Sequence, residues 1–111
     1  MYRLNDIRHI HFEPTQKCQA MCPMCDRTNN PHIKNAEISI DQFKQIIDVS
    51  LAQQLTSFLM CGNHGDPLAA KDSLDIYEWL RYNNKDLYLH MTTNAGGRSD
   101  DWWKRLAGIF G

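Results

Sequence analysis

Apolar and polar positions follow two different periods along the chain, and the changes of period divide it into three similar units. Short runs rich in apolar residues predict strands at about residues 7–13, 56–62 and 87–93, and the first and third of these runs alternate polar with apolar positions. Apolar residues three or four positions apart predict helices after a cap at Ser39, over residues 73–82, and after a cap near Ser99. A strand followed by a helix, three times over, predicts an α/β fold with parallel strands joined by right-handed crossovers.

The first helix has the clearest start signal. Ser39 is a typical N-cap residue, and Gln42 three positions later completes a capping box. We expect one helix to continue from this cap, with a single apolar face formed by Phe43, Ile46, Ile47 and Leu51.

Two of the predicted strands alternate polar with apolar side chains, although buried parallel strands are usually almost continuously apolar. The polar positions are His9, His11, Glu13, Tyr88, His90 and Thr92. One side of the sheet is therefore expected to line a polar cavity. The alternative is that these strands lie at exposed edges with one solvated face, and both interpretations stay open.

The composition suits one globular domain over residues 1–111, or a piece of a larger one: 42% of the 111 residues are hydrophobic and 23% are charged. A net charge of -1 gives no basic footprint for nucleic acid or an anionic membrane surface. No apolar run is long enough for a signal peptide or a membrane span. The default expectation is a reducing cytoplasm, where clustered cysteines are metal-binding or catalytic rather than disulfide-bonded.

Each predicted strand is followed by an unusual loop. The first loop carries three cysteines in the run CQAMCPMC (18–25), the second reads GNHGDP (62–67), and the third reads NAGG (94–97). In βα architectures ligands bind on the loops at the carboxyl ends of the strands. The three loops are therefore expected to form one site.

The cysteine spacing CxxxCxxC suits an iron–sulfur cube in which three thiolates from Cys18, Cys22 and Cys25 bind three irons and the fourth iron has no protein ligand. Two alternatives remain. One is a structural zinc site completed by His32, Cys61 or His64, although zinc sites usually show two separated ligand pairs. The other is a redox dithiol at Cys22 and Cys25, which does not explain Cys18.

The run EPTQKCQAMCPMC (13–25) resembles the signature of the radical S-adenosylmethionine superfamily, and the Gly-Asp-Pro and Thr-Asn loops strengthen the resemblance, which covers nearly the whole chain. It implies the N-terminal part of a partial (βα)6 TIM-like barrel. It also implies a [4Fe-4S] cluster whose fourth iron chelates S-adenosylmethionine. An external electron donor would reduce the cluster, and cleavage of the sulfonium would release a 5′-deoxyadenosyl radical that abstracts a substrate hydrogen.

The resemblance further implies five cofactor-binding residues: Met24, Gly65, Asp66, Pro67 and Asn94. Glycine next to a ligand permits close backbone approach and positive φ. Asp66 and His64 replace a glutamate and a glycine of the family pattern, and Ala95 follows Asn94 where glycine is common.

For two further residues the sequence suggests more ordinary roles. Cys61 is expected to be a small buried hydrophobic residue, and Arg27 is either an exposed arginine or a modifier of the cluster charge. The substrate is not specified by the sequence. A noncatalytic zinc-binding or electron-transfer module is the alternative function. The chain is expected to be a fragment, or a half that requires a C-terminal half or a partner chain.

Overall fold

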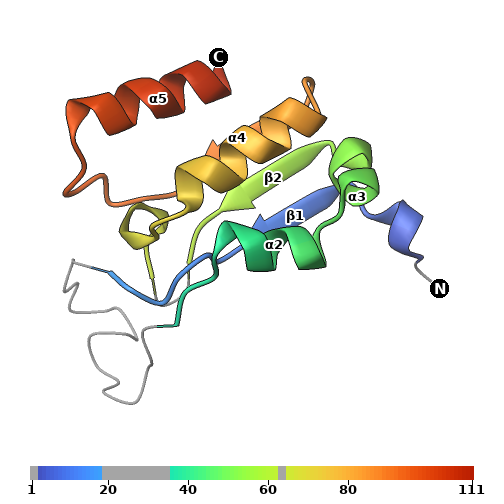
Figure 1. Cartoon of the computed structure of the whole chain (residues 1–111), viewed down its shortest axis with the longest axis horizontal. Helices are drawn as coiled ribbons and strands as arrows, with labels where there is room; N and C mark the ends of the chain where they lie inside the picture. Colours follow the sequence, from blue (N-terminus) through green and yellow to red (C-terminus); the bar gives the residue numbers. More distant parts are fainter. Residues whose placement is uncertain (1–2, 19–35, 63–64) are drawn as a thin grey trace.

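The protein is described by a computed structural model that covers residues 3–18, 36–62 and 65–111. Three parallel strands form one sheet in the order β1-β2-β3, as the sequence predicts (Figure 1). The strands are β1 (His9–Phe12), β2 (Ser57–Met60) and β3 (Tyr88–Met91). The helices are α2 (Ile40–Ile46), α3 (Val49–Gln54), α4 (Ser73–Asn83) and α5 (Asp100–Phe110), with short 3-10 turns η1 (Leu4–Asp6) and η2 (Pro67–Ala69).

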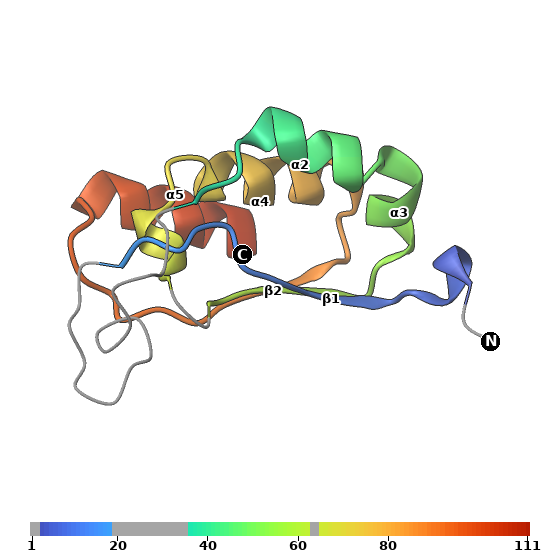
Figure 2. The same ribbon diagram turned by 90° about the horizontal axis from the view of Figure 1, so that it is seen from below.

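The four α-helices all lie on one side of the sheet (Figure 2). Side chains alternate between the faces of a strand, and the row Ile10, Phe58 and Leu89 points to the helical side. The neighbouring rows carry His9 beside Ser57 and Tyr88, then His11 beside Leu59 and His90. Within the described residues no helix covers this second face. The polar positions of β1 and β3 therefore share one open face.

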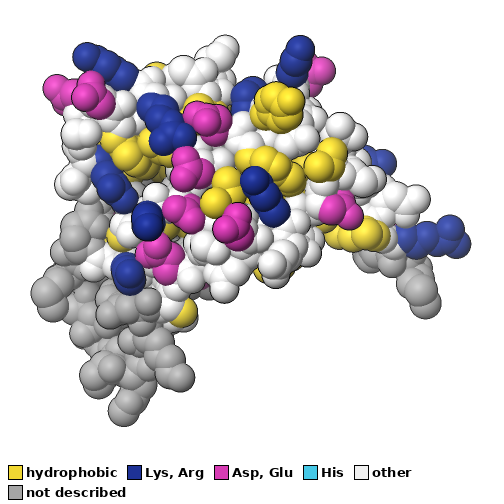
Figure 3. All heavy atoms as spheres, in the orientation of Figure 1, with side chains coloured by type: hydrophobic (Ala, Val, Ile, Leu, Met, Phe, Trp, Pro, Cys, Tyr) yellow, Lys and Arg dark blue, Asp and Glu magenta, His cyan; other side chains and the backbone are white. Residues whose placement is uncertain are grey.

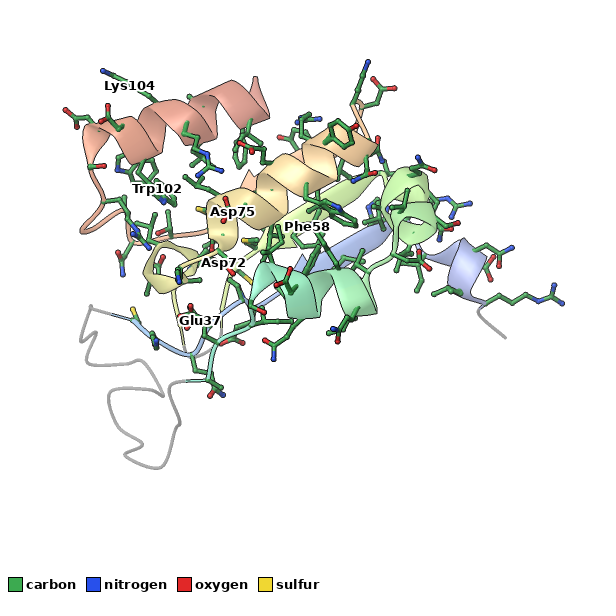
Figure 4. All side chains as sticks on the ribbon, viewed as in Figure 1. Glu37, Phe58, Asp72, Asp75, Trp102 and Lys104 are labelled. Carbon is green, nitrogen blue, oxygen red and sulfur yellow. The ribbon has the colours of Figure 1, made fainter. Side chains whose placement is uncertain are left out.

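The core lies between the sheet and the helices and is rich in aromatic rings. Phe58 is fully buried between the strands and the helices (Figure 4). Its ring meets those of Phe43 and Tyr77 edge to face, with centroids 5.8 and 6.1 Å apart. Such pairs add about 0.5–1.5 kcal/mol to the stabilisation that area burial gives. The aromatic cluster therefore fixes α2 and α4 against the central strand.

Tyr77 also makes a polar connection inside this core. Its hydroxyl accepts a hydrogen bond from the Met60 N–H at 3.2 Å and donates one to the His90 carbonyl. Burial raises the pKa of the phenol above its ordinary value, so the hydroxyl stays protonated at physiological pH. One side chain of α4 thus bridges β2 and β3.

The first helical segment differs from the prediction of one helix. Helix α2 ends at Ile46, and α3 begins after Asp48, whose carboxylate accepts the Leu51 N–H at 2.8 Å. The break leaves Ile46 64% exposed while Ile47 stays buried. The placement of Ile46 on the buried face was therefore wrong, because a second N-cap interrupts the apolar period. The Ser39 and Gln42 capping box, in contrast, is confirmed.

The helical surface carries charges of both signs. Basic and acidic side chains are interspersed over the helices in the space-filling view (Figure 3). Arg105 of α5, for example, pairs with Asp75 and Glu78 of α4 at 2.8 and 3.2 Å.

Within the described ranges every helix is too short or too polar to span a lipid bilayer.

Replacing Tyr77 with phenylalanine tests the bridge between β2 and β3. We expect Tyr77→Phe to lower the free energy of unfolding by about 1–2 kcal/mol, because the Met60 N–H and the His90 carbonyl lose their shared partner. Urea denaturation followed by circular dichroism measures this. Tyr82→Phe is the matched control, since Tyr82 is 85% exposed and its hydroxyl contributes little. Equal midpoints for both variants would contradict the proposed role of the bridge.

Candidate functional site

The segment that leads to Cys18 is held from one side by residues just before α2. Gln16 N–H donates to the Ala36 carbonyl at 2.8 Å, and Ile38 N–H donates to the Pro14 carbonyl at 2.9 Å. These bonds flank an antiparallel bridge between Thr15 and Glu37. The beginning of the cysteine loop is therefore anchored to the chain that returns from it.

Glu37 extends this anchor toward α4. Its carboxylate accepts the Lys71 N–H at 3.0 Å and pairs with Lys17 Nζ at 3.4 Å. Partial burial alone would raise the pKa of Glu37, but the bond from Lys71 and the nearby Lys17 ammonium outweigh it and lower the pKa. In Figure 4 Glu37 lies just before the start of α2, near Asp72 at the start of α4. Asp72 in turn accepts the Ile40 N–H at 2.8 Å.

On its other side the segment touches the loop after β2. A Cβ atom added to Gly65 would lie 2.7 Å from the Thr15 carbonyl carbon, closer than real contacts allow. Only glycine therefore fits at position 65. The reason is a close approach of two backbones. The positive φ that was also expected for this glycine is not found, because Gly97 is the glycine with positive φ in the described part of the chain.

Asp66 links all three loops. Its Oδ1 accepts the Leu68 N–H at 2.9 Å and the Thr93 hydroxyl at 2.5 Å, and its Oδ2 accepts the Asn94 N–H at 2.7 Å. Its own N–H donates to the Lys17 carbonyl at 2.9 Å. The residue is 5% exposed. Both carboxylate oxygens are thus used inside the protein, and Asp66 is a structural link between loops.

Asn94 brings the loop after β3 into contact with Cys18. Its Nδ2 lies 3.5 Å from Cys18 Sγ, and its Oδ1 accepts the Gly96 N–H at 2.9 Å. Cys18 is half-buried and not in a disulfide. The sequence predicts that Cys18, Asp66 and Asn94 belong to one site. In the structure all three lie beyond the carboxyl ends of the strands, and Asn94 contacts both Cys18 and Asp66. Pro67 is buried in η2 immediately beyond Asp66.

The loop after β3 turns through an unusual backbone conformation. Ala95 has φ 62°, in the left-handed region that favours glycine. The Ala95 N–H donates to the Thr93 hydroxyl at 3.2 Å, and this same hydroxyl donates to Asp66. The turn therefore holds an alanine in a strained backbone conformation.

Several predicted residues lie outside the described residues. These are Cys22, Met24, Cys25, Arg27, His32 and His64. Within residues 3–18, 36–62 and 65–111 no three His, Cys, Asp or Glu side chains are grouped so that they could hold a metal ion. The three-cysteine ligand set thus stays a prediction.

Cys61 does not behave as the buried hydrophobic residue expected from the sequence. It is half-exposed, and its Sγ lies 2.6 Å from Nε2 of His11. The two side chains line a cavity of about 190 Å³ together with Phe12 and Glu13. Partial burial and the charge of Glu13 raise the pKa of the Cys61 thiol, which favours the protonated form. Strand alternation could have indicated this placement, because the buried Met60 precedes Cys61.

A larger cavity of about 610 Å³ lies between the end of β1 and α2. Its wall includes Glu13, Gln16 and Ile46 but none of Cys18, Asp66 and Asn94. It is therefore adjacent to the base of the cysteine loop and separate from the convergence of the three loops.

Comparison with known proteins adds no family assignment. No protein-family model matches the chain, and no curated protein matches it in sequence.

Asp66→Asn tests the link between the loops. We expect the free energy of unfolding to fall by about 2–3 kcal/mol, because an NH2 group would face donors that the carboxylate now satisfies. Chemical denaturation measures the change. Asp86→Asn, at an exposed position, should change stability by less than about 0.5 kcal/mol. If both substitutions have the same small effect, Asp66 is not a structural link.

Ala95→Gly tests the strained turn. Left-handed backbone costs an L-residue about 1–2 kcal/mol, while glycine adds about 0.5–1 kcal/mol of unfolded-state entropy. The variant should therefore be more stable by about 0.5–1 kcal/mol. Ala107→Gly, at an exposed position of helix α5, should instead be less stable by about 1 kcal/mol. Thermal melts of both proteins give the comparison, and destabilisation by Ala95→Gly would refute the strain.

Proposed function

We propose that the chain is part of a radical S-adenosylmethionine enzyme. The observation that carries the proposal is the convergence of Cys18, Asp66 and Asn94 at the carboxyl ends of three parallel strands. This is the edge where βα architectures bind ligands. The family signature that the sequence resembles begins at Glu13 and runs through the same loop.

In this proposal the thiolates of Cys18, Cys22 and Cys25 hold a [4Fe-4S] cluster. The donor set fits, because thiolates are the protein ligands of such clusters and Cys18 is half-buried with its sulfur free of a disulfide. When bound, the cluster and S-adenosylmethionine would supply one-electron chemistry for the abstraction of a substrate hydrogen. The protein binds and orients these groups and excludes water.

The cofactor would lie beside the loops after β2 and β3. Gly65, Pro67 and Asn94, together with Met24, are the proposed contacts to S-adenosylmethionine. Asp66 is proposed to act differently from the family acid. It orients the loops, because three donors already occupy its two oxygens.

The sheet is proposed to be one part of a partial (βα)6 TIM-like barrel. Helices on one face and polar side chains on the other support this, since barrel strands face helices outward and the lumen inward. The open face would then be the inner wall around the substrate. Further strands would come from a C-terminal half or a partner chain. We also propose that the protein works in a reducing cytoplasm and that an external electron donor reduces the cluster.

The experiment is anaerobic reconstitution with iron and sulfide. Cys18→Ala should lose the cluster, whereas Cys61→Ala should keep it, because Cys61 lies beside His11 rather than in the cysteine loop. Iron content and the visible spectrum distinguish the two variants. Loss of iron in both would favour a site that includes Cys61.

Adding S-adenosylmethionine to the reduced cluster then separates the enzyme from a noncatalytic metal-binding or electron-transfer module. An altered electron paramagnetic resonance spectrum, with formation of 5′-deoxyadenosine, is expected for an open iron. An unchanged spectrum would favour the noncatalytic module, and zinc without iron would favour a structural zinc site.

A further inference from the structure

The Asn94 carboxamide has a defined orientation. Its oxygen accepts the Gly96 N–H at 2.9 Å, and a backbone N–H can only donate. The oxygen must therefore face Gly96, and the NH2 group faces Cys18 Sγ at 3.5 Å. The side chain presents a hydrogen-bond donor, rather than an acceptor, to the sulfur.

The backbone that carries this donor is also fixed. Asn94 N–H donates to Asp66 Oδ2 at 2.7 Å, and the preceding Thr93 donates its hydroxyl to Oδ1 of the same carboxylate at 2.5 Å. Asp66 in turn donates its N–H to the Lys17 carbonyl, next to Cys18. The donor and the sulfur are thus joined by a short network although they are 76 positions apart.

We infer that Asn94 raises the reduction potential of an iron–sulfur cluster bound through Cys18, by donating a hydrogen bond to the ligating sulfur. The inference rests on the proposed function and deepens it. Reduction adds negative charge that is shared by the cluster and its sulfur ligands. A donor at the sulfur stabilises this charge, and hydrogen bonds to the sulfurs are among the factors that set cluster potentials. In its effect on the potential, which is separate from its proposed contact with S-adenosylmethionine, Asn94 acts through Cys18 and is a positioning residue.

The test compares reduction potentials of reconstituted proteins, measured by anaerobic redox titration with electron paramagnetic resonance. Asn94→Ala removes the donor and should shift the midpoint to a more negative value at unchanged iron content. Asn94→Asp should shift it further, because a carboxylate places an acceptor and a charge beside the sulfur. The Asn94→Asp variant can keep the backbone bond to Asp66 and the bond from Gly96. It therefore still tests the inference if Asn94→Ala folds poorly.

Gln53→Glu is the matched control. It makes the same change from carboxamide to carboxylate at an exposed position of α3, which precedes the amino end of β2. Its midpoint should equal that of the wild type. If Asn94→Ala and Asn94→Asp bind full iron with the wild-type midpoint, the inference is overturned while the proposed function stands. If the wild-type chain binds no cluster, both are overturned.

Discussion

The arrangement of the candidate site depends on one buried carboxylate. Parallel strands are held together by their ladder only as far as the strands extend, and the loops beyond them need other partners. Asp66 supplies these by accepting hydrogen bonds from Leu68, Thr93 and Asn94. Burying a charge is costly unless its hydrogen bonds are made, and here every donor belongs to a loop that leads from β2 or β3. The need of the buried Asp66 carboxylate for hydrogen bonds is therefore met by bringing the loops after β2 and β3 together.

The sequence predicts the features that depend on neighbouring residues. The cap at Ser39, the cap at Ser99 and the parallel order of the strands all agree with the structure. The break between α2 and α3 was missed because two local signals compete. The apolar period favours a continuous helix, whereas Asp48 can begin a new one, and burial of Ile47 and Leu51 is satisfied by the broken arrangement.

The candidate site was predictable as a location but not as a set of contacts. Topology alone brings the three loops to one edge of the sheet. The partners within it are decided by packing between distant segments, and no local pattern encodes these. Gly65 illustrates this, because its lack of a side chain accommodates the backbone of Thr15, which lies 50 positions earlier in the chain. Asp66 is similar, since its hydrogen bonds with Thr93 and Asn94 join segments 27 and 28 positions apart.

The Tyr77 hydroxyl gives the fold a mechanical property. Because one side chain of α4 bonds to backbone groups of both β2 and β3, the helix cannot slide along the sheet without breaking both hydrogen bonds. The two bonds therefore couple the position of the helix to that of both strands. Thr92 N–H continues the ladder by donating to the Met60 carbonyl at 2.9 Å, so the coupled structure reaches the start of the loop that carries Asn94. A shift of α4 would thus be transmitted through β2 and β3 to that loop.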